Sequence, residues 1–209
     1  MVFTKGEKAG MSRMQRVLIY LSVLLLAACT MPETRMYTLH VPVPGEAENT
    51  KTNASIVVQI NSERYLKQPY IAYRKSPYEI EISRYSRWEL SPGRMVRKEF
   101  KNALLSTGLF KEVRTANVML KGFYSLRIDL KRFERLDDKE GFSGILVFDA
   151  VLLSPDGSEL YQGTISKKAG LLDNKDFSDL AEGLSSALQQ GIAEVSGHVV
   201  NTIHQHHNK

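Results

Sequence analysis

The sequence has very little cysteine and no long apolar run. Its 209 residues include one cysteine, Cys29, so no intramolecular disulfide can form and disulfide-rich secreted folds are excluded. The apolar run over residues 17–28 is well below the roughly 20 residues that a membrane-spanning helix needs, so we expect no permanent span. The run instead has the length of the apolar part of a secretory signal.

The start of the chain predicts export and lipidation. Two arginines precede the apolar run and small residues end it, as in a secretory signal. Its last residues, Leu26-Ala27-Ala28-Cys29, resemble the lipobox of bacterial lipoproteins, where the cysteine receives diacylglycerol. We predict a signal peptide over residues 1–28, with translation starting at Met11, and lipid on Cys29. Thr30 follows in place of the aspartate that retains lipoproteins in the inner membrane, which favours the periplasmic face of the outer membrane. The alternative is an ordinary secreted protein with an unpaired cysteine.

The exported chain has little net charge. The whole sequence has 28 basic and 23 acidic residues, a formal net charge of +5. The predicted signal peptide accounts for +3 of this charge, through Lys5, Lys8, Arg13 and Arg16 against Glu7. The remainder is near +2, which gives no reason to expect nucleic acid as a partner.

The predicted mature chain divides into a tether and one domain. Residues 30–36 and 42–54 are rich in Pro, Glu, Thr, Asn and Lys, and a short strand is expected between them at 36–41. We assign residues 29–54 to the lipidated cysteine, this strand and a tether. Residues 55–209 are long enough for a single domain with its own core.

Several segments have strand patterns. Leu126, Ile128 and Leu130 alternate with charged residues, the pattern of a half-buried strand. Two turn signals, Lys75-Ser76-Pro77-Tyr78 and Pro155-Asp156-Gly157, each separate two such segments and predict hairpins. The other expected strands cover residues 55–61, 70–74, 79–83, 145–153 and 159–167.

Two helices are expected. The first begins after Ser91-Pro92, an N-cap residue followed by proline at the first helical position. The second opens around Asp176 and carries apolar residues at three- and four-residue steps. Gly183, Gly191 and Gly197 each weaken it by up to about 1 kcal/mol relative to alanine, so we expect packing against the sheet to hold it. Two helices on one face of a mainly antiparallel sheet predict an α+β fold, a two-layer sandwich.

The sequence offers no convincing catalytic or metal-binding constellation. Ser143, in Gly-Phe-Ser-Gly, lacks the full Gly-x-Ser-x-Gly elbow and follows no strand-to-helix pattern. Clustered histidines and an acidic loop lack the spacing of a defined metal site (His204, His206 and His207; Asp137, Asp138 and Glu140). We therefore predict a non-enzymatic protein with no metal and no cofactor, apart from the covalent lipid on Cys29.

Residues 65–88 are the least ordinary segment. They contain five of the nine tyrosines and the only tryptophan, Trp88. Aromatic residues and arginine are enriched in protein interfaces. Tyrosine is also an ordinary strand residue, so composition leaves an interaction surface and a core segment equally open.

The same segment carries a family resemblance. With the lipobox, it resembles the ABC-type transport auxiliary lipoproteins that accompany MCE-domain transport systems. The resemblance covers about residues 29–200 and is sharpest over residues 65–113. The segments that carry it are Tyr37-Thr38-Leu39, Tyr65-Leu66, Pro69-Tyr70-Ile71-Ala72-Tyr73-Arg74 and Tyr85-Ser86-Arg87-Trp88. The chain departs from the family pattern at Lys67-Gln68 and after Trp88, which puts the subfamily in doubt.

The resemblance implies a docking role without catalysis. In such systems an inner-membrane ABC transporter supplies the work, MCE proteins form a conduit, and the lipoprotein serves at the outer-membrane end. It therefore implies an MCE-domain protein as partner. Phospholipid is a second candidate ligand, on the separate hypothesis that the domain itself binds lipid. The residues expected nearest to the interface are Tyr70, Tyr73, Arg74, Arg87 and Trp88. Arg87 and Trp88 could equally pin the start of the first helix into the sheet.

Other functions stay open at this point. The domain could bind lipid itself, in a groove between helix and sheet, or serve as an outer-membrane assembly or envelope scaffold lipoprotein. An enzyme would need two or more titratable groups that converge in a cleft.

Overall fold

The computed structural model describes residues 13–15, 33–42, 52–172 and 176–207. They belong to two separate units, Met1–Glu33 and Thr34–Lys209. In the first unit, residues 13–15 form a single helical turn. Cys29, Met11 and the end of the predicted signal peptide lie outside the described residues.

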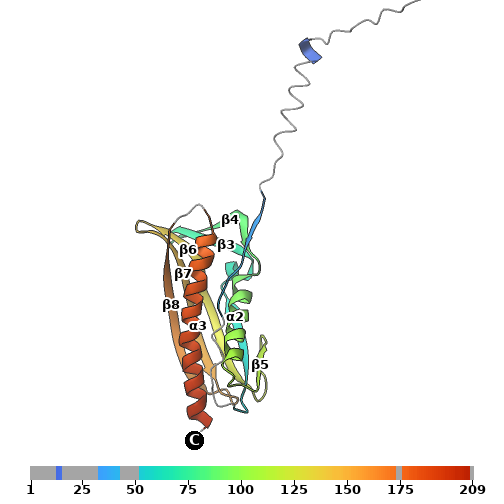
Figure 1. The fold of residues 1–209 in the computed structure, drawn as a ribbon, viewed down its shortest axis with the longest axis vertical. Helices are drawn as coiled ribbons and strands as arrows, with labels where there is room; N and C mark the ends of the chain where they lie inside the picture. Colours follow the sequence, from blue (N-terminus) through green and yellow to red (C-terminus); the bar gives the residue numbers. More distant parts are fainter. Residues whose placement is uncertain (1–12, 16–32, 43–51, 173–175, 208–209) are drawn as a thin grey trace, which may run out of the picture. The chain divides into compact units, whose positions relative to one another are not determined.

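Three long strands form one half of the sheet in the second unit, with β8 at its edge (Figure 1). They pair antiparallel, in sequence order: β6 (Tyr124–Asp138), β7 (Gly141–Leu153) and β8 (Glu159–Leu171). Leu126, Ile128 and Leu130 of β6 are buried, as their alternation predicts. The predicted turn between β7 and β8 is confirmed, and Gly157 within it has a φ of 91°, which glycine adopts at little cost.

The other half of the sheet mixes parallel and antiparallel pairs. β2 (Ser55–Ser62) runs parallel to the first half of β6, and β3 (Tyr70–Ser76) runs parallel to its second half. The remaining strands are β4 (Glu79–Trp88), antiparallel to β3, β5 (Glu112–Thr115), parallel to β2, and β1 (Arg35–Tyr37), parallel to β4. The predicted β3–β4 hairpin is confirmed, but the prediction of a mainly antiparallel sheet was wrong.

A short 3₁₀ helix, η1 (Arg64–Lys67), accounts for this difference. It joins β2 to β3, and both strands then run along the same edge of β6 in the same direction. Hairpins have local turn signals, whereas parallel pairs form between residues far apart in the sequence. Turn chemistry therefore predicted the antiparallel pairs and missed the parallel ones.

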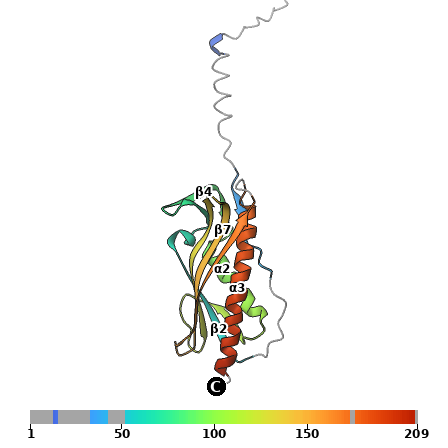
Figure 2. The same ribbon diagram turned by 90° about the vertical axis from the view of Figure 1, so that its left-hand side faces the viewer.

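Two long helices cover one face of the sheet, which confirms the α+β class (Figure 2). They are α2 (Pro92–Ser106) and α3 (Ser178–His207). Ser91 occupies the N-cap position of α2, but its side chain makes no capping hydrogen bond. At the start of α3, the backbone N–H of Ser178 donates to Asp176 Oδ1 across 2.8 Å. No helix within the described ranges is both long and apolar enough to cross a membrane.

Glycines let α3 approach the sheet closely. A Cβ atom at Gly191 would lie 3.1 Å from Ile165 Cγ2 and 3.1 Å from Phe148 Cε1. At Gly183 the nearest atom, Leu171 Cδ2, would be 3.0 Å away. Two of the glycines that weaken the helix thus permit its packing on β7 and β8, as expected from the sequence.

Residues 35–42 pack against the domain, and the first three of them form β1, where the sequence predicted a short strand over residues 36–41. The ring of Tyr37 meets Phe177 edge-on at 6.1 Å between centroids, and its hydroxyl donates to Asp176 across 2.8 Å. The backbone N–H of His40 donates to Ser185 Oγ across 3.1 Å. Residues 35–42 therefore belong structurally to the sheet and to the helix layer.

Candidate functional site

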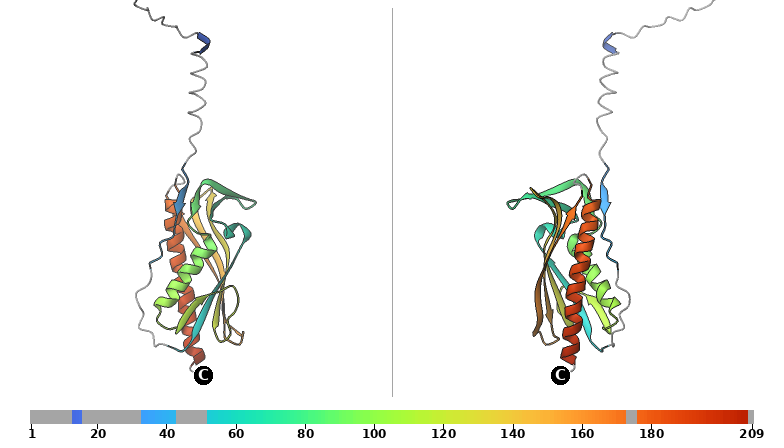
Figure 3. Two further views of the ribbon diagram at one scale, coloured as in Figure 1. Left: turned by 90° about the vertical axis from the view of Figure 1, so that its right-hand side faces the viewer. Right: turned by 60° about the vertical axis from the view of Figure 1, so that its left-hand side comes forward.

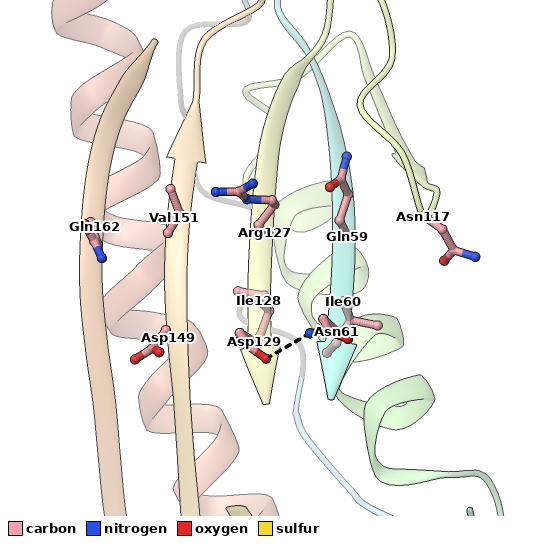
Figure 4. Close-up of a pocket in the computed structure, with 10 residues that line it drawn as sticks. All are labelled: Gln59, Ile60, Asn61, Asn117, Arg127, Ile128, Asp129, Asp149, Val151 and Gln162. Atoms are coloured by element: carbon pink, nitrogen blue, oxygen red, sulfur yellow. Dashed lines mark hydrogen bonds between the residues drawn. The ribbon is translucent and has the colours of Figure 1, made fainter. Parts of the chain in front are cut away.

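α2 and α3 leave the other face of the sheet uncovered (Figure 3). A shallow groove of about 380 Å³ lies on it, across β2, β6, β7 and β8 (Figure 4). The groove is lined by Gln59, Ile60, Asn61, Asn117, Arg127, Ile128, Asp129, Asp149, Val151 and Gln162. Ligand sites are usually concave and largely apolar, so this open and polar groove is a poor match for a small-molecule pocket.

The charged groups of the groove largely satisfy one another. Lys131 Nζ donates a short hydrogen bond to Asp129 Oδ2 and lies 4.0 Å from Asp149 Oδ2. Thr164 donates to Asp149 Oδ1 across 2.7 Å. The bond to Asp129 raises the pKa of Lys131, so the lysine is held in its charged form. These two carboxylates act as counter-ions to Lys131.

The candidate residues of β3 and β4 separate into exposed and enclosed ones. Tyr70 and Arg87 face each other directly across the two strands, and both are exposed. Tyr73 is half-buried, and its hydroxyl donates to Glu81 Oε2 across 2.7 Å. This bond raises the pKa of Tyr73. The pair Tyr70 and Arg87 is therefore available to a partner, while the hydroxyl of Tyr73 is already engaged.

Arg74 belongs to a buried polar cluster. Its Nε donates to Glu134 Oε1 across 2.7 Å, and the Glu134 side chain has 0% exposure. Arg132 Nε donates to the same oxygen across 2.7 Å, and the Tyr65 hydroxyl donates to the other across 2.8 Å. Burial, and then the Glu134 charge, raise the pKa of Tyr65 far above its ordinary value. Arg74 thus stabilises a buried carboxylate inside the domain.

Trp88 is a core residue in this structure. Its side chain is 1% exposed and packs edge-on against Phe133, with ring centroids 5.3 Å apart. It ends β4, four residues before α2 begins. The structure therefore places Trp88 where the alternative role, joining the helix start to the sheet, requires it.

Three further residues lie exposed beside Tyr70 and Arg87, and none of them was among the candidate interface residues predicted from the sequence. Ile80, Ile82 and Tyr85 of β4 are 37%, 43% and 49% exposed. We call these five exposed residues, Tyr70, Ile80, Ile82, Tyr85 and Arg87, the hairpin surface. The signal was the alternation Glu79-Ile80-Glu81-Ile82, which is typical of a strand with one apolar face and which indicated only a hairpin strand here.

Other sequence candidates are occupied by structural contacts. Ser143 is 5% exposed within β7. Asp137 is bound by Arg135 at 2.7 Å, and Lys168 lies 3.8 Å from Asp138 and 3.3 Å from Glu140. The described residues contain no group of three or more His, Cys, Asp or Glu placed to hold a metal ion.

His206 also has a structural partner. Its Nδ1 lies 3.0 Å from the hydroxyl of Tyr124, which is buried at the start of β6. His204 is half-buried on α3, and the side chain of His207 lies outside the described residues. The contact with Tyr124 joins the last turn of α3 to the sheet.

Comparison with known families decides the assignment. The family described as ABC-type transport auxiliary lipoprotein component matches residues 37–196, which is most of the chain. The chain belongs to this family. The match covers all of α2 and every strand, except for most of β1. It therefore describes the domain as a whole. No curated protein matches the chain.

Solved structures share the fold of this auxiliary lipoprotein. Protein XCC0632 from Xanthomonas campestris superimposes with a TM-score of 0.72 at 20% identity, over 83% of this chain and 99% of that one. The hypothetical protein CT253 from Chlamydia trachomatis has a TM-score of 0.52 at 8% identity, over 73% and 98% of the two chains. At these identities the likeness shows the fold alone.

Proposed function

We propose that this auxiliary lipoprotein is a non-enzymatic docking component of an ABC-type MCE lipid transport system. Lipid on Cys29 anchors it to the periplasmic face of the outer membrane, and its domain receives an MCE-domain protein. Family membership supports the transport role. The lipobox and Thr30 support the anchor and its membrane.

The observation that carries the docking role is the hairpin surface. Tyr and Arg are the residue types that dominate binding energy at interfaces, and here they lie beside exposed isoleucines. β1 pairs only with Ser86, Arg87 and Trp88 of β4, so within the described residues the strand edge over residues 79–85 has no partner on that side. Such an edge can accept an extended segment of another protein through backbone hydrogen bonds.

The packing of the domain argues against the carrier alternative. Side chains of α2, α3 and the sheet form one continuous buried cluster where a lipid groove was considered. The small apolar cavity between Val41, α2 and α3 measures about 80 Å³. Sites for drug-sized ligands are roughly 300–1,000 Å³, so this cavity is too small for a phospholipid.

Site-specific photocrosslinking in the native envelope tests the docking role. A photoreactive residue would replace Tyr70 or Arg87 in the hairpin surface, and mass spectrometry would identify the captured molecules. Lys98 on α2 is the matched control, since its side chain is 63% exposed on the helix layer. We expect an MCE-domain protein to be captured from positions 70 and 87 and not from position 98.

The other outcomes each favour a different function or site. Capture of an MCE protein from position 98 alone would place the interface on the helices and remove the hairpin surface from the proposal. Capture of assembly or peptidoglycan-binding proteins at 70 and 87 would favour the scaffold function. Capture of phospholipid alone would favour the carrier function.

A further inference from the structure

Strand register places three chain segments at one end of the sheet. The β3–β4 turn follows the pair Ser76 and Glu79, and β3 runs beside the end of β6. The β6–β7 turn and the end of β8 lie at the same level, because Phe142, near the start of β7, pairs with Leu171. β1 enters the sheet at this end, next to the start of α3 (Figure 1).

This end carries strongly exposed apolar side chains. Tyr78 in the β3–β4 turn is 95% exposed, and Leu172 directly after β8 is 98% exposed. Met36 in β1 is 67% exposed. These three residues come from segments far apart in the sequence. Single exposed apolar residues are ordinary, so what these three side chains contact depends on what this end of the domain faces.

The position of the predicted anchor identifies what this end faces. Five residue steps separate Cys29 from Thr34, where the domain begins. At 3.3–3.6 Å per residue, a fully extended chain of this length spans at most about 18 Å. A lipid on Cys29 therefore holds the start of β1, and with it this end of the domain, close to the membrane surface.

We propose that Met36, Tyr78 and Leu172 form a membrane-contacting end that rests in the interfacial zone of the bilayer. The inference rests on the lipid anchor of the proposed function, but it does not depend on the identity of the docking partner. Tyrosine suits such a position, because its ring is apolar and its hydroxyl remains in contact with water and headgroups.

Charge at this end does not favour a purely electrostatic contact. Arg35 pairs with Asp176, Lys75 with Glu81, and Lys168 with the acidic residues of the β6–β7 turn, where the exposed Lys139 lies between Asp138 and Glu140. Cations that are already paired attract anionic lipid weakly. The contact should therefore depend on apolar side chains and persist at high salt, where electrostatic attraction is screened.

Tryptophan scanning with brominated lipids tests this orientation. The lipidated protein would be reconstituted in vesicles of phosphatidylethanolamine and phosphatidylglycerol, with or without bromine near the top of the acyl chains. Tyr78→Trp and Leu172→Trp place a reporter at the proposed contact. Glu159→Trp is the matched control, because it is an exposed strand residue at the opposite end of β8. The native Trp88 is 1% exposed and supplies a constant background.

We expect bromine to quench the added fluorescence at positions 78 and 172 by about half, since interfacial groups reach roughly 5–10 Å into the headgroup and acyl boundary. The twelve residue steps of β8 between positions 159 and 171 span about 40 Å, so position 159 should be unaffected. High salt should leave the quenching unchanged.

Each failure has its own meaning. Vesicle-bound protein with no more quenching at 78 and 172 than at 159 would overturn the inference. A protein that lacks the lipid mass and does not float with vesicles would overturn both the inference and the anchor. Quenching at 78 and 172 without any crosslink to an MCE protein would support the membrane contact and contradict the proposal that an MCE protein is the docking partner.

Discussion

Arg74 donates to Glu134 across 2.7 Å, and the carboxylate that it binds has no accessible surface. A buried charge is tolerated only where it is paired and hydrogen-bonded, and Arg132 and Tyr65 supply the additional bonds. The cluster joins β3, β6 and η1. Arg74 therefore serves the domain as a counter-ion, and the adjacent Tyr70 and Arg87 remain for a partner.

The first prediction concerns Tyr65→Phe and alkaline pH. Burial and Glu134 raise the pKa of Tyr65 above its ordinary value of 10.0, so the folded state holds the phenolic proton more tightly than the unfolded state. That contribution to stability is fully present below pH 10 and is lost as pH rises toward the folded pKa. At neutral pH the variant should lose about 1–2 kcal/mol with the hydrogen bond to the buried carboxylate.

Urea unfolding between neutral pH and about pH 11 measures this effect. The free energy of unfolding should fall more steeply with alkaline pH for the wild type than for Tyr65→Phe. Tyr85→Phe is the control, because Tyr85 is 49% exposed, and its curve should follow that of the wild type. Parallel curves for Tyr65→Phe and the wild type would show that Tyr65 does not bond Glu134 in solution.

The sequence predicted the long elements better than the connections between them. Alternation in β6 and the apolar stripe of α3 are local patterns repeated over many residues, and both elements are found, although β6 continues to Asp138, beyond the predicted end at Arg132. β5 has four residues, of which one is buried, so it has too little pattern to recognise. The position of β2 and β3 beside β6 depends on long-range contacts, which no local signal records.

The candidate site shows the same limit. Composition selected Tyr70, Tyr73, Arg74, Arg87 and Trp88 together, because aromatic residues and arginine serve both interfaces and cores. Arg74 differs from Arg87 in exposure because it binds Glu134, which lies 60 residues further along the chain. Exposure is set by such distant partners. The sequence could therefore identify the segment, but it could not distinguish the exposed residues from the buried ones.

The second prediction concerns the glycines of α3. Gly191→Ala should destabilise the protein by about 1–3 kcal/mol, because its Cβ would press on Ile165 and Phe148 at 3.1 Å. Gly197→Ala is the matched control, since no atom of the part of the chain that the structure describes lies within 4 Å of its Cβ position. It should stabilise the protein by up to about 1 kcal/mol through helix propensity. Denaturant unfolding measures both variants, and equal stabilisation by the two would show that α3 stands further from the sheet.

The third prediction distinguishes residues that stabilise the core from residues that contact a partner, near the end of β4. Trp88→Ala should cost about 3–5 kcal/mol, because it empties a site packed against Phe133. Trp88→Phe should cost about 1–2 kcal/mol, since the smaller ring keeps part of the packing and removes the indole N–H, which has no hydrogen-bond partner among the described residues. Tyr70→Ala, at an exposed position, should change stability by less than about 0.5 kcal/mol.

Unfolding in urea and capture of the partner are measured on the same three variants. Tyr70→Ala should reduce capture at unchanged stability, whereas Trp88→Phe should lower stability and leave capture of the folded protein intact. If Trp88→Phe instead abolished capture with no loss of stability, the indole would have to reach the partner directly. That result would require β4 to open in the complex, because the ring is enclosed by the core in the free domain.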